Sequence, residues 1–92
     1  MGYRIELGEI ETAINSLKDV LEAICFFDAD NDEIVCEYRG GIDDGELIRQ
    51  LGTRLPRYMM PNVCVCRKTM PYNANGKIDR VSIRKEYFSE KN

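Results

Sequence analysis

A chain of 92 residues, with 43% hydrophobic and 32% charged residues, is long enough for one small domain and too hydrophobic for a disordered segment. It contains no run of about 18 apolar residues and no signal peptide, so we expect a cytoplasmic protein without a membrane partner. Histidine is absent, which excludes a Ser-His-Asp or Cys-His catalytic set.

The net charge of −3 hides an uneven distribution. Residues 1–48 carry three basic and thirteen acidic groups (−10), whereas residues 49–92 carry ten basic and three acidic groups (+7). A basic half is most often a solvated surface, but it can also receive phosphate or an acidic partner. Nucleic acid is not expected, because aromatic residues are not interleaved with basic residues on any predicted strand.

The first predicted elements are a short extended piece at 3–5 and a helix at 6–17. The helix has one apolar stripe at helical spacing, formed by Leu7, Ile10, Ile14, Leu17 and Leu21. Two β-rich runs, at 23–30 and 33–40, flank a cluster of turn residues. This arrangement predicts a β-hairpin.

A second helix is predicted at 43–55, with Asp43 as its N-cap and Glu46 as the capping-box partner. Prolines follow this helix and set an extended connection. A third strand at 62–68 comes next.

A loop with an Asn75-Gly76 turn then leads to a final helix capped by Asp79. The predicted order is therefore β-α-β-β-α-β-loop-α. The fold class is α+β, a small central β-sheet with flanking helices.

The four cysteines are Cys25, Cys36, Cys64 and Cys66. They lie in apolar runs and lack the spacing of a disulfide framework or a zinc site. We expect buried free thiols that pack as small hydrophobic residues, and no metal ligands.

Three stretches stand out, and each also has an ordinary structural interpretation. They are "GYRIELGEIE" at 2–11, "LPRYMMP" at 55–61 and "NGKIDR" at 75–80. Lys77 can be a solvated turn residue or a compact positive charge directed at phosphate or carboxylate oxygens. The Tyr-Met-Met run can pack a helix-to-strand corner or contact another domain.

In this order the three stretches resemble the last three core motifs of amino-acid adenylation domains. Those domains occur in nonribosomal peptide synthetases and D-alanine–carrier-protein ligases, within the adenylate-forming superfamily. The resemblance runs from Gly2 to about Tyr87. The last motif reads Asn75-Gly76-Lys77, which is similar to the amino-acid activators, whereas acyl-CoA synthetases tend to carry Ser-Gly-Lys.

The resemblance implies that residues 1–92 form a C-terminal lid subdomain, without the large N-terminal subdomain. The implied enzyme makes an aminoacyl-adenylate from an amino acid and ATP with Mg²⁺, which the large subdomain mainly binds. It then loads the phosphopantetheine arm of a carrier protein. Lys77 matches the catalytic lysine, and Gly76 in the turn before it is expected among the cofactor-binding residues. Gly2, Tyr3 and Arg4 match the loop that faces the pantetheine arm and are the other expected cofactor-binding residues.

The basic half is a candidate surface for the carrier protein, which is typically acidic. The candidate residues are Arg49, Arg54, Arg57, Arg67 and Lys68. One alternative is a stand-alone module that docks carrier proteins without catalysis, and another is a nucleic-acid binder. We expect the 92 residues alone to be folded and inactive, since the implied substrate pocket lies elsewhere.

Overall fold

The computed structural model describes residues 6–90, so the expected extended piece at 3–5 lies outside the described residues. The elements are α1 (Leu7–Asn15), β1 (Val20–Asp28), β2 (Glu33–Gly40), α2 (Asp44–Leu51), the 3₁₀ turn η1 (Arg57–Met59), β3 (Val63–Cys66) and α3 (Arg80–Glu90). The α+β class is confirmed. The order of the described elements is α-β-β-α-β-α, which follows the predicted order from residue 6 onward.

The three strands form one mixed sheet in the order β1-β2-β3. β1 and β2 are an antiparallel hairpin, with Cys25 opposite Cys36. β2 and β3 are parallel, with Cys36 opposite Cys64. Parallel strands need a long crossover connection, and α2 with η1 supplies it.

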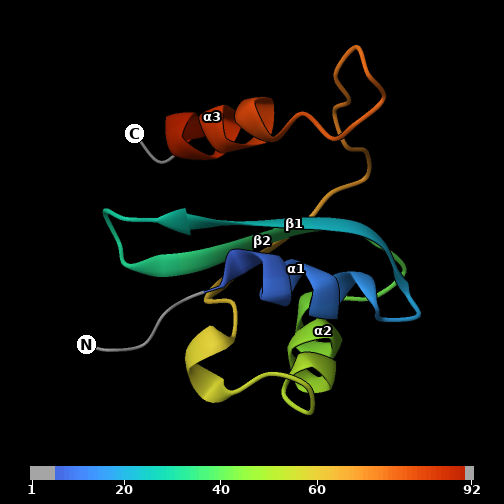
Figure 1. Ribbon diagram of the computed structural model, residues 1–92, viewed down its shortest axis with the longest axis vertical. Coiled ribbons are helices and arrows are strands. Elements are labelled where there is room, and N and C mark those ends of the chain that lie inside the picture. The colour runs from blue at the N-terminus through green and yellow to red at the C-terminus, as the bar shows by residue number, and fades with distance from the viewer. Residues whose placement is uncertain (1–5, 91–92) are drawn as a thin grey trace.

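Helices cover both faces of this sheet (Figure 1): α1 and α2 lie on one face and α3 lies on the other. Side chains of a strand alternate between the two faces. Ala23 and Cys25 of β1 therefore pack with the α1 and α2 side, and Ile24 and Phe26 pack with the α3 side. Because both faces are buried, β1 is a nearly continuous apolar run rather than an alternating one.

The predicted apolar stripe of the first helix is wrong at its end. The helix ends at Asn15, and Leu21 lies in β1 with 66% of its surface exposed. The register of β1 against β2 shifts between Val20 and Glu22. A bulge of this kind leaves the extra residue unpaired and bends the strand, so Leu21 does not join the core.

The predicted N-caps are confirmed, but the capping box is only half formed. Asp43 accepts a hydrogen bond from the backbone N–H of Glu46 (2.8 Å), and Asp79 accepts one from the N–H of Ser82 (3.1 Å). The Glu46 carboxylate binds Arg49 and Gln50 instead of returning to the cap. These hydrogen bonds, that of Arg49 first, lower the pKa of Glu46 to about 2.

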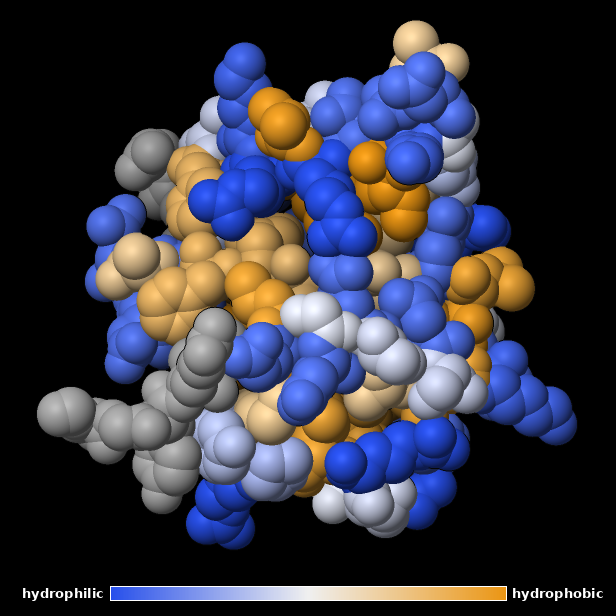
Figure 2. Space-filling view, viewed as in Figure 1, coloured by the Kyte–Doolittle hydropathy of each residue, from blue (hydrophilic) through white to orange (hydrophobic). Residues whose placement is uncertain are grey.

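The corner between α2 and β3 uses its Tyr-Met-Met run in two ways. Met59 is buried in the α1–α2 core, whereas Tyr58 is exposed. Cys25 and Cys36 are buried free thiols as expected, but Cys66 is exposed. Figure 2 shows hydrophilic residues over much of one face, with hydrophobic residues visible between them in several places.

Over residues 6–90, no helix has the length and hydrophobicity needed to cross a membrane.

Candidate functional site

The Lys77 loop, residues 71–79, connects the segment after β3 to α3 at one end of the sheet (Figure 1). Asn73 organises it. Its backbone N–H donates to the carbonyl of Lys77 (2.7 Å), and its carbonyl accepts from Gly76 (3.0 Å). Its side-chain Oδ1 accepts from the N–H groups of Asn75 (2.9 Å) and Lys77 (3.1 Å).

Gly76 lies in the left-handed region, with a φ of +79°, which glycine adopts at little cost. The expected turn at Asn75-Gly76 therefore exists, although the side chain that closes it is Asn73. Lys77 follows this turn and is exposed. It lines a shallow hollow together with Tyr72 and Arg80. No residue of the described part of the chain pairs with its ammonium group.

Tyr72 anchors the first half of the Lys77 loop to β1. Its hydroxyl donates to Glu22 Oε2, and Arg39 Nε of β2 donates to the same oxygen (2.8 Å). The Tyr72 hydrogen bond, followed by that of Arg39, lowers the pKa of Glu22. Tyr72 also forms a β-bridge with Ile78, which closes the loop on itself.

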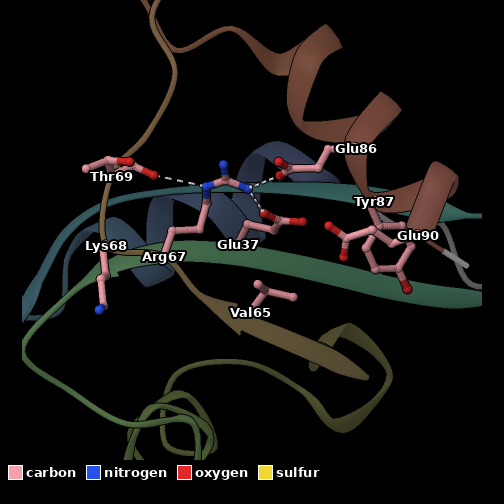
Figure 3. A pocket seen from close by; sticks show the side chains of 8 residues that line it. All are labelled: Glu37, Val65, Arg67, Lys68, Thr69, Glu86, Tyr87 and Glu90. Carbon is pink, nitrogen blue, oxygen red and sulfur yellow. Dashed lines mark hydrogen bonds and ion pairs between the residues drawn. The ribbon is translucent and has the colours of Figure 1, made fainter.

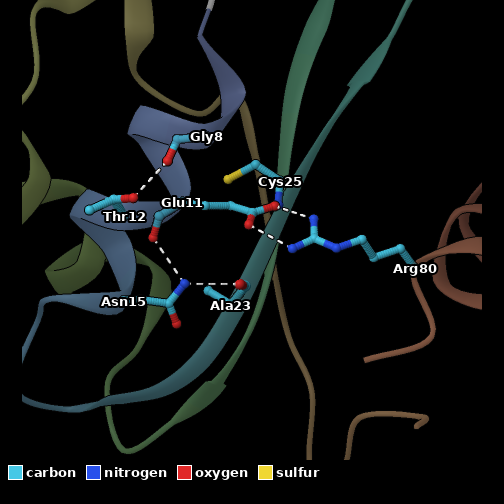
Figure 4. Close-up of polar contacts among 7 residues, drawn as sticks. All are labelled: Gly8, Glu11, Thr12, Asn15, Ala23, Cys25 and Arg80. Atoms are coloured by element: carbon cyan, nitrogen blue, oxygen red, sulfur yellow. Dashed lines mark hydrogen bonds and ion pairs between the residues drawn. The ribbon is translucent and has the colours of Figure 1, made fainter. Parts of the chain in front are cut away.

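Arg80 anchors the second half of the Lys77 loop. Its two terminal nitrogens donate to Glu11 Oε2 (2.5 Å) and Oε1 (2.9 Å). Glu11 Oε2 also accepts from the backbone N–H of Cys25 (2.8 Å), so one carboxylate joins α1, β1 and α3 (Figure 4). Glu11 ends the first sequence motif and Arg80 ends the last, 69 positions apart in the chain.

Arg67, a predicted carrier-binding residue, is engaged inside the subdomain (Figure 3). Its Nη1 donates to Glu37 Oε1 (2.8 Å) and Glu86 Oε1 (2.7 Å), and its Nε donates to the Thr69 carbonyl (3.0 Å). Glu37 is 2% exposed. Burial raises the pKa of Glu37 although Arg67 opposes the shift. Arg67 thus ties the segment after β3 to β2 and α3.

The other four basic candidates differ in whether their positive charges are already bound within the subdomain. The Arg49 guanidinium binds the Glu46 carboxylate, and Arg54 donates to the Ser16 hydroxyl (3.0 Å). Arg57 and Lys68 are exposed, and neither forms an ion pair with another described residue. Lys68 points away from Arg67 (Figure 3).

Gly2, Tyr3 and Arg4 lie outside the described residues, and their role stays a prediction. Within residues 6–90 no three histidine, cysteine or acidic side chains are grouped so that they could hold a metal ion.

Sequence reasoning missed the side chains that hold the Lys77 loop in place. Local patterns assign no role to Glu22, Asn73 and Tyr72, and they indicate Glu11 only as part of a motif. Asn73 has a usable signal, because asparagine two residues before a turn often accepts from the following backbone. The pairing of Glu11 with Arg80 has no local signal, because it depends on the tertiary fold.

Several known proteins are similar in sequence to most of this chain, although no protein-family model matches it. It is 41% identical over 87 residues to gramicidin S synthase 2 of Brevibacillus brevis, covering 89% of this chain and 2% of that protein. It is 39% identical over 84 residues to tyrocidine synthase 3 of Brevibacillus parabrevis, covering 86% of this chain and 1% of that protein.

A solved four-domain nonribosomal peptide synthetase, bound to AMP and glycine, contains the same fold with a TM-score of 0.74. Its sequence is 34% identical, and the match covers 88% of this chain and 6% of that protein. The chain therefore spans only a few per cent of the length of these relatives. It belongs to the C-terminal subdomains of nonribosomal peptide synthetase adenylation domains, in the adenylate-forming superfamily.

Proposed function

We propose that this chain is the mobile lid subdomain of an ATP-dependent, amino-acid-activating ligase. The observation that carries the proposal is the state of Lys77. It is exposed on a closed, doubly anchored loop, and no described residue pairs with its ammonium. A charge held in this way is available to a substrate bound outside the subdomain.

In the proposed first half-reaction, the amino-acid carboxylate attacks the α-phosphorus of ATP. A bond forms between a carboxylate oxygen and phosphorus, and the bond to pyrophosphate breaks. Negative charge crowds where the two anions meet. The Lys77 ammonium offsets this repulsion and stabilises the transition state, and it holds the two groups in reacting geometry.

The test is Lys77→Ala in the full-length enzyme, measured by exchange of pyrophosphate into ATP. We expect a large loss of exchange, with thioester formation from supplied adenylate much less affected. Lys85→Ala is the matched control, because Lys85 is an exposed lysine on α3 that does not line the Lys77 hollow. Exchange near the wild-type rate in Lys77→Ala would refute the assignment.

For the second half-reaction we propose that the segment Gly2-Tyr3-Arg4 faces the site after the subdomain rotates. The thiol of the phosphopantetheine arm then attacks the aminoacyl carbonyl and displaces AMP. Gly2 lets the backbone approach the arm closely. A bulky residue at Gly2 should slow thioester formation and spare adenylation, and an equal loss in both steps would contradict this role.

We also propose that the basic half receives an acidic carrier protein. No described carboxylate neutralises the positive charges of Arg54, Arg57 and Lys68. Arg54 and Arg57, which lie three positions apart in the chain, are the first pair to test. Reversing both charges should raise the KM for the carrier protein, and added salt should shrink the difference. An unchanged KM at low salt would exclude this surface.

A further inference from the structure

The Lys77 loop is held from both sides by carboxylates of the subdomain body. Tyr72, five residues before Lys77, binds Glu22 of β1. Arg80, three residues after it, binds Glu11 of α1. Neither carboxylate belongs to the loop or to α3, so both attach the loop to elements of the packed core.

The Glu11–Arg80 contact has the geometry of an orienting pair. Two parallel hydrogen bonds between a guanidinium and a carboxylate fix direction as well as distance. Glu11 itself is fixed, because its Oε2 also accepts from the N–H of Cys25 on the edge strand β1. Figure 4 shows the carboxylate between this N–H and the Arg80 guanidinium.

The solvent exposure of the Glu11–Arg80 ion pair indicates that it positions the loop more than it stabilises the fold. The Glu11 side chain is 16% exposed and that of Arg80 is 55% exposed. An ion pair whose arginine is mostly exposed contributes little to the free energy of folding. The pair has a greater effect on the position of the Lys77 loop, because Arg80 is the first residue of α3 and directly follows that loop.

We propose that Glu11 and Arg80 are positioning residues for Lys77, and that their ion pair sets where the ammonium arrives in the adenylation site. This inference rests on the proposed function of Lys77. It differs from it because neither Glu11 nor Arg80 touches substrate. Misplacing a reacting group by an ångström can cost about 100-fold in rate, so loosening one anchor should lower the adenylation rate without weakening substrate binding.

The experiment uses Glu11→Gln and Arg80→Met in the full-length enzyme. Glutamine retains an oxygen for the Cys25 N–H while removing the charge, so the edge of β1 stays satisfied. We expect kcat for ATP–pyrophosphate exchange to fall about 10- to 100-fold. KM for ATP and for the amino acid should be unchanged, and thioester formation from supplied adenylate should be retained.

Combining the substitutions tests whether Glu11 and Arg80 affect the adenylation rate by positioning Lys77. The double variant Glu11→Gln/Arg80→Met should be no slower than the slower single variant, because both changes break one contact. In a Lys77→Ala background, Glu11→Gln should cause no further loss. A further loss there of the size seen with Lys77 present would overturn the proposal, since the pair would then act by another route.

A control variant at a second arginine of α3, and amide exchange in the Lys77 loop, test whether the pair has only a structural role. Arg84 of α3 lies over the Phe26 and Phe88 rings, 5.3 and 5.5 Å from their centroids, so Arg84→Met disturbs the same helix without touching the Lys77 loop. Arg84→Met should leave kcat unchanged, and amide exchange at Gly76 should accelerate in Arg80→Met but not in Arg84→Met.

The possible outcomes separate the inference from the proposed function. If Lys77→Ala leaves exchange at the wild-type rate, the proposed function fails and the inference fails with it. If Lys77→Ala is slow but Glu11→Gln and Arg80→Met are as fast as wild type, only the inference fails. It also fails if both half-reactions slow equally, or if Arg84→Met reproduces the loss of kcat.

Discussion

From the ion pairs of Arg67 we predict that replacing this residue lowers the stability of the fold. Arg67 is the cation for Glu37, whose side chain is 3% exposed, and it also reaches Glu86 on α3. Replacing Arg67 by methionine keeps most of the side-chain volume and removes both ion pairs. The Glu37 carboxylate is then left buried without a charge partner.

The cost follows from the burial of Glu37. Removing one member of a buried ion pair costs about 3–5 kcal/mol, because an uncompensated charge remains. We expect a loss at the lower end, about 3 kcal/mol at neutral pH, because the Arg67 side chain is 18% exposed and because Glu37 can escape by taking up a proton. Replacing Glu37 by methionine as well should recover most of this loss.

The pH dependence gives a second signature. Burial raises the pKa of Glu37 above its ordinary value of 4.5, so the folded protein binds more protons than the unfolded chain just above that value. This contribution to stability is present at low pH and is lost as pH rises through the folded pKa. Without Arg67 the pKa rises further, so Arg67→Met should lose more stability at about pH 8 than at about pH 5.

Urea unfolding of the 92-residue chain, followed by circular dichroism, measures these free energies. Three variants are needed: Arg67→Met, Glu37→Met and the double variant. The reasoning is refuted if Arg67→Met unfolds at the wild-type urea concentration, or if the double variant is less stable than Arg67→Met. A loss that does not change with pH would show that Glu37 is not its cause.

Three further predictions concern backbone and thiols. Gly40→Ala should destabilise the fold by about 3 kcal/mol in urea unfolding, because a Cβ there would lie 2.2 Å from a backbone carbonyl oxygen. Gly41→Ala is the control and should be neutral, because its Cβ would meet nothing within 4 Å. Gly76→Ala should cost about 1–2 kcal/mol in local loop stability, seen as faster amide exchange, because φ is +79° although space is free. A maleimide should modify the exposed Cys66 before the two buried cysteines, as read by mass spectrometry of digests.

The sequence predicts elements well where a local pattern decides the structure. The strand expected at Glu33–Gly40 has the bounds that the structure shows, because turn residues flank a β-rich run. Asp43 and Asp79 are expected as N-caps, and both accept backbone hydrogen bonds. Such signals depend on neighbouring residues, so tertiary structure seldom overrides them.

The errors arise where another part of the chain, near or distant, competes with the pattern that the sequence shows. The spacing of Leu21 fits a helical stripe, but pairing between β1 and β2 takes the chain into a bulge there. Glu46 fits a capping box, but its carboxylate is claimed by Arg49 and Gln50 one turn later. Local patterns state what a residue can do, and packing decides which of the possibilities is realised.

The same competition explains why the candidate site is only half predictable. Lys77 is found through its motif, yet nothing near it in the chain indicates Glu11 or Glu22 as the groups that hold its loop. Both carboxylates lie in the N-terminal acidic half, and Arg80 lies in the C-terminal basic half. The charge asymmetry that suggests an acidic partner is therefore partly satisfied within the subdomain itself.

These contacts also constrain how Lys77 would move if it acts as proposed. A loop that shuttled by itself would have to break the Arg80–Glu11 pair and the Tyr72–Glu22 hydrogen bond in every cycle. Rotation of the whole subdomain breaks none of them. The bonding pattern therefore favours delivery of Lys77 by a rigid-body motion of the lid over a rearrangement of the loop within it.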